Sequence, residues 1–254
     1  MKKTIITALI IVCTVFVNAQ LKFTISPPKY ELFVSPNETK TMTVTVNNLG
    51  DSAIHIKVYE SDWTIDFENK IKFLPPGTIK NSCSGWFYIN PQEFNIDGQS
   101  YADVRVTLNV PDNVYGDYWS LLFFESSPIS FSDKPAVAFN SRVGCTFYSS
   151  INGTVSKNGE ITSMDYSKDK NTLKVGFENL GNIHLRAKGF LQIFKDSVMI
   201  YEKNITDQLI LPEMERNILF PVDTYLKKGS YTFKVYIDYG GTELLEGEKT
   251  IFTQ

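Results

Sequence analysis

The sequence predicts an all-β protein made of two tandem immunoglobulin-like β-sandwich domains that follow a cleaved signal peptide. The chain has 254 residues, which is too long for one such sandwich of about 100 residues and fits two of them plus an export signal. Its dominant pattern is short runs in which apolar and polar residues alternate, and no long helical period follows the N-terminal segment. A third observation, the recurrence of two sequence motifs, indicates that one domain layout occurs twice.

The N-terminal segment has the three parts of a signal peptide. Lys2 and Lys3 are positively charged, residues 5–17 are mostly apolar, and the small residue Ala19 precedes a cleavage position before Gln20. We therefore expect residues 1–19 to be removed and the mature chain to be periplasmic, or secreted to the cell surface, in a bacterium. The apolar run is shorter than the about 20 residues that a membrane-spanning helix needs. No second such run follows, so we expect no integral membrane span in the mature chain.

Alternation with a period of two predicts strands that have one side on a core and the other side in water. Clear examples are residues 42–46, 54–58 and 104–110 in the first half, and residues 173–177 and 233–237 in the second half. Turn-forming residues separate such runs, as at positions 48–51, 75–77, 97–98 and 111–113. Short strands with regular turn signals are typical of a sandwich or barrel, and not of alternating strands and helices.

The two repeated motifs set the domain organisation. Residues 46–51 (VNNLGD) recur as residues 177–182 (FENLGN), and residues 116–118 (GDY) recur as residues 229–231 (GSY). In both halves the Asn-Leu-Gly motif ends one strand and starts the next, where Gly can adopt a positive φ at low cost. Residues 149–159 are polar, small and Gly-containing, as an inter-domain linker tends to be. We therefore expect one domain at residues 20–150 and a second at residues 151–254.

The charge balance argues against nucleic acid as a partner. The 25 lysines and arginines and the 28 aspartates and glutamates give a net charge of −3. Removal of residues 1–19 takes away two lysines and no acid, which makes the mature chain more acidic. Binding to a phosphate backbone needs clustered Lys and Arg, and an acidic chain of this kind does not offer them.

Cys83 and Cys145 are the cysteines that remain after removal of the signal. An exported chain meets an oxidising compartment, so a disulfide between them is one expectation. Such a bond needs Cα atoms within about 7 Å, which the sequence does not establish. The alternative is two small side chains that are buried separately.

The sequence lacks the residue inventory of an enzyme. His55 and His184 each lie on an alternating run and are expected at the surface, and no catalytic, phosphate-binding or cofactor-binding motif is present. Four acidic residues lie close together but match no calcium-loop spacing, so we expect a solvated strand edge rather than a metal site. These four residues are Glu60, Asp62, Asp66 and Glu68. The chain is therefore expected to be non-enzymatic, without a cofactor or metal.

The three tryptophans, Trp63, Trp86 and Trp119, all lie in the first half of the chain. Large aromatic rings often anchor the core of a sandwich, and we expect that role for them. The alternative is a face that binds sugars.

Several segments of the first domain together resemble a known family. They are residues 25–32 (ISPPKYEL), the run from position 36 to position 48, residues 82–91 (SCSGWFYINP), residues 116–125 (GDYWSLLFFE) and residues 141–148 (SRVGCTFY). The first two are similar to the opening of PapD-type pilus chaperones, the third to the middle strand of that family, and the others to the last two strands of the family's first domain. The resemblance implies a periplasmic chaperone whose partners are exported β-rich subunits of pili or surface fibres, with an outer-membrane assembly protein as a further partner.

In that family the last strand of the first domain is lent to an incomplete subunit, whose gap it fills. Main-chain hydrogen bonds at an unpaired strand edge give affinity, and alternating apolar side chains fill the gap. The resemblance places the lending strand within residues 135–148. Val137, Phe139, Val143 and Phe147 point to one side of it by parity. The alternative is that these side chains face only the core of the sandwich.

The resemblance also implies a carboxylate-binding site in the cleft between the domains. Lys29 matches the family's basic residue on the first strand, whereas Cys145 stands where the family has a lysine on the last strand. Arg142 lies nearby and is the expected substitute, because a guanidinium can bind a carboxylate bidentately. By parity it lies on the opposite side of the strand from Cys145. The alternative for Lys29 and Arg142 is a solvated charge on a strand.

A second resemblance gives an alternative function. The strand at residues 141–148, followed by Asn152 and Gly153, is also similar to the peptidoglycan-binding first domain of WxL-type surface proteins. It implies a structural or adhesive cell-surface module that binds peptidoglycan or a partner protein. Those proteins normally carry a C-terminal membrane anchor, and the sequence ends at Gln254 without one, which favours the chaperone-like function.

Overall fold

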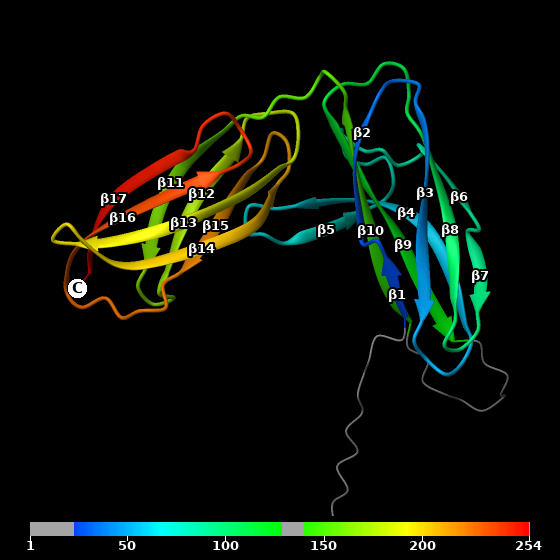
Figure 1. Ribbon diagram of the computed structural model, residues 1–254, viewed down its shortest axis with the longest axis horizontal. Helices are drawn as coiled ribbons and strands as arrows, with labels where there is room; N and C mark the ends of the chain where they lie inside the picture. The colour runs from blue at the N-terminus through cyan, green and yellow to red at the C-terminus, as the bar shows by residue number, and fades with distance from the viewer. Residues whose placement is uncertain (1–22, 129–139, 254) are drawn as a thin grey trace, which may run out of the picture.

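The computed structural model describes residues 23–128 and 140–253, and within these ranges it contains strands and no helix. The strands form two β-sandwiches that follow one another along the chain (Figure 1). The predicted fold class, an all-β chain with two tandem immunoglobulin-like sandwiches, is confirmed. The signal peptide expected at residues 1–19 lies outside the described residues and stays a prediction.

The first sandwich consists of two sheets around one core. One sheet has the order β1 (Phe23–Ser26), β3 (Thr39–Asn48), β8 (Tyr101–Asn109), β6 (Phe87–Asn90). The other has the order β2 (Lys29–Val34), β10 (Ser141–Ile151), β9 (Asp117–Pro128), β4 (Ile54–Ile65), β5 (Ile71–Leu74), and β7 (Glu93–Ile96) pairs with β4 as well. The inward positions of the alternating runs fill the core, which includes the buried side chains of Val44, Val106, Phe124 and Phe147.

The second sandwich is built in the same way. One sheet has the order β11 (Gly159–Ser167), β12 (Thr172–Asn179), β15 (Glu215–Pro221), and the other has the order β14 (Val198–Ile210), β13 (Leu185–Lys195), β16 (Gly229–Asp238), β17 (Leu245–Thr253). Phe177, Phe220 and Phe233 are fully buried in its core. Residues 152–158 connect β10 to β11, so the connection starts later than the polar sequence indicates. Ser149 and Ser150 are buried within β10, where they pair with both β9 and β2.

The repeated Asn-Leu-Gly motif makes the same hydrogen bonds in both domains. Asn48 and Asn179 are buried at the ends of β3 and β12, and each accepts a hydrogen bond from the amide of the glycine two residues later, Gly50 or Gly181. Each side-chain amide donates to three main-chain oxygens, which belong to Ser52, Ile96 and Asp97 in the first domain and to Ile183, Ile210 and Leu211 in the second. One asparagine thus ties together separate chain segments at one end of each sandwich.

The N-terminal segment of the chain passes from one sheet of the first domain to the other between β1 and β2. β1 pairs antiparallel with β3, the chain passes the cis Ser26–Pro27 peptide bond, and β2 then pairs parallel with β10 in the opposite sheet. The parallel register begins with Lys29 opposite Thr146 and ends with Val34 opposite Ile151. This pairing places the start of β2 beside the middle of β10.

A hairpin arm of the first domain reaches the second domain. β4 continues beyond the sandwich and pairs with the short β5, and Figure 1 shows this pair extending toward β14 and β15. At its tip the side chain of Asn69 donates to the main-chain oxygen of Asn217 (3.0 Å) and accepts from Nε of Arg216 (2.6 Å). Asn217 in turn donates to the main-chain oxygen of Phe67 (2.9 Å). The arm therefore holds β15 through hydrogen bonds in both directions.

An apolar cluster fills the contact between the arm, the first sandwich and the second domain. Trp63 from the arm and Trp119 from β9 are 6% and 5% exposed, and they pack with Tyr148 and with Leu211 of the second domain. The indole of Trp119 donates to the main-chain oxygen of Trp63 (3.0 Å). Trp86 packs instead against the core of the first sandwich. Two of the tryptophans therefore lie at the domain junction rather than in the sandwich core that the sequence predicts for them.

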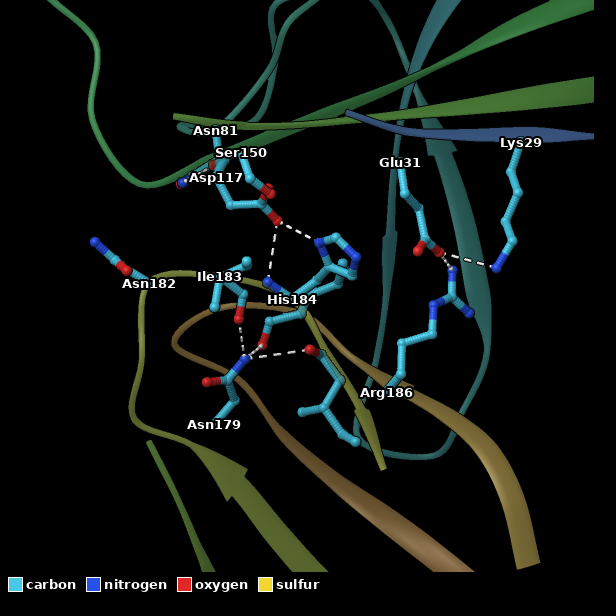
Figure 2. Close-up of polar contacts among 12 residues, drawn as sticks. Lys29, Glu31, Asn81, Asp117, Ser150, Asn179, Asn182, Ile183, His184 and Arg186 are labelled. Atoms are coloured by element: carbon cyan, nitrogen blue, oxygen red, sulfur yellow. Dashed lines mark hydrogen bonds and ion pairs between the residues drawn. The ribbon is translucent and has the colours of Figure 1, made fainter. Parts of the chain in front are cut away.

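A buried carboxylate joins the two domains beside this cluster (Figure 2). Asp117, at the start of β9, accepts hydrogen bonds from the Ser150 hydroxyl (2.8 Å) and from the His184 amide (3.0 Å), and its Oδ2 lies 2.6 Å from His184 Nδ1. The His184 ring packs against the Tyr148 ring, tilted by 30°, with 4.3 Å between ring centroids. The expectation of a surface histidine is therefore wrong for His184, because the domain junction covers it. His55 does lie at the surface, next to Asn95.

Replacement of the repeated asparagine should destabilise its domain. Asn48→Ala leaves three buried or half-buried carbonyl oxygens and one amide without their partner, so we expect the free energy of unfolding to fall by about 3 kcal/mol. Urea unfolding followed by tryptophan fluorescence measures this loss. Asn113→Ala, at an exposed turn position, is the matched control and should change the free energy by less than about 0.5 kcal/mol. Equal effects of the two substitutions would contradict the proposed role of Asn48.

Removal of the buried carboxylate should weaken the domain junction. Asp117→Ala leaves the Ser150 hydroxyl, the His184 amide and His184 Nδ1 without an acceptor in a buried place, so we expect a loss of about 3 kcal/mol in the free energy of unfolding. Small-angle scattering should also report a more variable separation of the two domains. Asp112→Ala removes an exposed carboxylate from the preceding loop and should leave both measurements unchanged. An unchanged scattering curve for Asp117→Ala would mean that the other junction contacts suffice.

Candidate functional site: a strand edge beside the domain junction

Among the described residues, strands pair with both sides of β10, the last strand of the first domain, along only part of its length. β10 pairs with β9 from Ser141 to Ser150, whereas β2 covers its other side only from Thr146 to Ile151. Among the described residues, no strand pairs with that other side of residues 141–145. At about 3.3 Å per residue, this leaves an edge of roughly 16 Å whose main-chain groups can bind an added strand.

The side chains of this edge alternate as the sequence predicts. Cys145 and Phe147 are buried in the core of the first sandwich, and Val143 is half-buried and packs against the same core. The ring of Phe147 packs between those of Tyr30 and Phe87, stacked on the first and tilted against the second, with centroid distances of 5.2 and 4.9 Å. Cys145 and Phe147 therefore face the core, as the core-facing alternative has it, whereas the half-buried Val143 keeps part of its surface exposed beside the open edge. Val137 and Phe139, the other two expected partner-binding residues, lie outside the described residues.

Lys29 lies in a charged group that both domains build (Figure 2). Its Nζ is 2.9 Å from Oε1 of Glu31, and the same oxygen lies 2.6 Å from Nη2 of Arg186 on β13 of the second domain. Arg186 also bonds Asp207 (3.0 Å) and lies over the Tyr148 ring. Burial acts to raise the pKa of Glu31, but the hydrogen bond from Lys29 and the charge of Arg186 outweigh it, so this pKa is lowered. The two cations therefore hold an ionised carboxylate between the domains.

Arg142 does not join this group. Lys29 lies opposite Thr146, which is four positions along β10 from Arg142, or roughly 13 Å along the strand. The Arg142 guanidinium lies 4.0 Å from the centre of the Phe123 ring and donates to the Tyr59 hydroxyl (3.3 Å). The structure therefore does not bring Lys29 and Arg142 together, and Arg186 is the cation that stands beside Lys29. Sequence reasoning missed Arg186 because it comes from the other domain and carries no motif.

The two cysteines are not paired with each other. Both are free and buried, and each has a separate polar neighbour: the Cys83 sulfur lies 3.3 Å from the Ser120 hydroxyl, and the Cys145 thiol donates to the main-chain oxygen of Pro27 (3.3 Å). Burial raises the pKa of each thiol to about 12. The expected disulfide is therefore wrong, and the alternative of two separately buried side chains applies. Burial also disfavours deprotonation of either thiol to a reactive thiolate.

Of the four acidic residues, Asp62 is buried and Glu60 and Asp66 are half-buried, whereas Glu68 is exposed as a solvated edge predicts. Asp62 is fully buried, and its carboxylate accepts hydrogen bonds from the amides of Thr78 and Ile79 and from the hydroxyls of Ser82 and Ser84. Burial raises the pKa of the nearby Glu60, which accepts from the amide of Gly85. Asp66 caps the arm's turn by accepting from the amides of Glu68 and Lys70. Within the described residues no group of three or more metal-binding side chains comes together.

Comparisons with known proteins agree with the fold. No protein-family model matches the chain, and no curated protein matches it by sequence. Among solved structures, the class 5 fimbriae chaperone CfaA is similar with a TM-score of 0.51 and 17% identity, over 89% of this chain and 98% of that one. A chain from a chaperone–tip adhesin complex of CFA/I fimbriae biogenesis gives a TM-score of 0.51 and 14% identity, over 90% of this chain and 99% of that one. Within the described residues no helix is long and apolar enough to cross a membrane.

At 14% and 17% identity, the likeness to these two fimbrial structures concerns the fold. The chain has the two-sandwich fold of PapD-like fimbrial chaperones.

Proposed function

We propose that this protein is an assembly chaperone that binds exported β-rich subunits of pili or surface fibres by strand addition to β10. The observation that carries the proposal is the edge at residues 141–145, which lies next to the domain junction and has no partner strand among the described residues. The fold that the chain shares with solved fimbrial chaperones supports it. The protein acts in this role by binding and not by chemistry, and the periplasm is the proposed compartment.

Strand addition gives a role to the edge that the described residues leave unpaired. Each main-chain N–H and C=O of residues 141–145 that points away from β9 can bond to a subunit strand, which supplies affinity without a fixed sequence. Val143 and, in the same proposal, Val137 and Phe139 supply apolar side chains that continue along the strand. Arg142, held against Phe123 and Tyr59, lines the outer face next to this edge. An outer-membrane assembly protein would then receive the bound subunit.

The apolar positions of the lending strand should control capture of the subunit. The tagged mature protein, isolated from the periplasm of its native host, should co-purify with an exported β-rich subunit. In the Val137→Asp/Phe139→Asp variant we expect at least about tenfold less subunit, because two charges would have to be buried in the subunit's gap. Mass spectrometry of the captured protein measures the amount.

A second apolar pair provides the control. Val198 and Met199 are exposed at the start of β14, far along the chain from β10. Val198→Asp/Met199→Asp adds the same charges to another strand edge and should leave the capture unchanged. Failure to capture any exported β-rich protein, or equal losses in both double variants, would refute binding through β10.

The charged group at the junction supplies a place for a subunit carboxylate. Lys29 and Arg186 already hold the carboxylate of Glu31 at 2.9 and 2.6 Å, so the spacing of the two cations suits such a group. A subunit whose chain ends in the cleft would compete with Glu31 for both. Arg186, rather than the more distant Arg142, is then the second cation of the proposed site.

This competition gives opposite effects for two neighbouring substitutions. Lys29→Gln should weaken binding of a peptide with a free C-terminus, derived from the captured subunit, by about fivefold, because it removes one partly exposed ion pair. Glu31→Gln should strengthen binding by a similar factor, because it removes the competing carboxylate. Isothermal titration calorimetry measures both, and the same peptide with an amidated C-terminus is the control. Equal affinities of the two peptides would exclude a carboxylate site, while leaving strand addition to β10 intact.

A further inference from the structure

The outer face of the sheet β1-β3-β8-β6 carries a continuous polar surface on the side of the first sandwich that Figure 1 shows facing away from the second domain. Alternation along β3 places a hydroxyl or amide side chain on this face at every second residue of the strand. Cross-strand hydrogen bonds join Thr39 to Asn109, Thr41 to Thr107 and Thr45 to Asp103, over 3.1, 3.0 and 2.7 Å. These bonds hold the side chains in fixed positions, which lowers the entropy cost of binding a ligand to them.

Two tyrosines on this face are strongly exposed. Tyr88 on β6 is 66% exposed and Tyr101 on β8 is 67% exposed. Tyr88 lies opposite Thr107, and Thr107 and Tyr101 lie on the same face of β8, six positions apart. The two rings are therefore separated by roughly 20 Å along the strand direction. Among the described residues, neither ring contacts another aromatic ring, so the exposed surface of each ring is available to a ligand.

A shallow hollow of about 310 Å³ lies between the two rings. Its lining residues are Thr43, Asn90, Asp103 and Arg105, all from the outward positions of β3, β6 and β8. The Arg105 guanidinium makes no hydrogen bond or ion pair with any other described side chain, so its donors are unused. Asp103 accepts from Thr45 and keeps further acceptor capacity. The hollow thus offers free donors and free acceptors within one surface.

We propose that this face binds an uncharged oligosaccharide. A sugar ring presents an apolar C–H face, which packs on an exposed aromatic ring, and a rim of hydroxyls that need both donors and acceptors. Tyr88 and Tyr101 supply the two rings, and the hollow between them supplies both kinds of polar group. The single positive charge of Arg105 and the single negative charge of Asp103 balance, which favours a neutral ligand over an anionic one. The roughly 20 Å between the rings suits a ligand of several sugar units rather than one.

This site is independent of strand addition to β10. The tyrosine face belongs to the β1-β3-β8-β6 sheet, whereas β10 belongs to the opposite sheet, so the core of the first sandwich separates the two surfaces. Binding at one surface leaves the other exposed. A chain of this kind can therefore hold a protein strand and a glycan at the same time.

Native gel electrophoresis through gels that contain a polysaccharide tests the proposal. The probes are four neutral polymers (xyloglucan, galactomannan, mixed-linkage β-glucan and dextran) and one acidic polymer, polygalacturonate. We expect at least one neutral polymer to slow the mature protein relative to a gel without polymer. Tyr88→Ala/Tyr101→Ala should weaken that binding by about tenfold or more, as the loss of two stacking contacts implies. Arg105→Gln should weaken it in the same direction.

Matched variants separate binding from general effects on the surface. Tyr88→Phe/Tyr101→Phe keeps both rings and should retain most of the binding, and Tyr225→Ala, which removes an 80% exposed tyrosine from the second domain, should retain all of it. Unchanged thermal unfolding of the alanine variant shows that the fold is intact. The proposal is overturned if no neutral polymer slows the protein, if only polygalacturonate does, or if the double alanine variant is slowed as much as the unmodified protein.

Discussion

The parallel pairing of β2 with the second half of β10 is the constraint on which the candidate site depends. It covers β10 from Thr146 onward and leaves residues 141–145 with one partner strand among the described residues. The same pairing sets Lys29 and Glu31 at the domain junction, where Arg186 of the second domain can reach Glu31. If β2 stayed in the β1-β3 sheet, the side of β10 that faces away from β9 would be unpaired along its whole length. Lys29 and Glu31 would then not lie at the domain junction. One change of sheet therefore positions both the open edge and the charged group.

Two fully buried carboxylates then hold the surroundings of that edge in place. Asp117 joins β9 to the second domain through His184, and Asp62 gathers the loop between β5 and β6 through four hydrogen bonds. A buried carboxylate without such partners would be strongly unfavourable, so each one stabilises a single arrangement of its neighbours. The arm that carries Trp63 completes the junction from the other side. Strand edge, charged group and arm thus form one connected region.

The sequence could predict what depends on local pattern. Alternation at Met42, Val44 and Val46 identified a strand and its buried side, and the recurrence of Asn-Leu-Gly identified two equivalent chain positions, at which the structure shows the same hydrogen bonds for Asn48 and Asn179. It could not predict contacts that arise when distant segments meet. His184 is buried because Asp117 and Tyr148 of the other domain cover it, and Arg186 meets Glu31 for the same reason. Residue type and spacing at these positions match an ordinary exposed strand, so no local signal distinguishes them.

The placement of the tryptophans gives the protein a built-in optical reporter. Trp63 and Trp119 lie against Leu211 and beside the contacting rings of Tyr148 and His184, whereas the second domain contains no tryptophan of its own. Any rotation of the second domain would change the polarity around these two indoles and the quenching of their emission by neighbouring side chains. Trp86, packed on the first core, would hardly respond. The intrinsic ultraviolet fluorescence of the unlabelled chain can therefore follow the angle between the domains in real time while a partner binds.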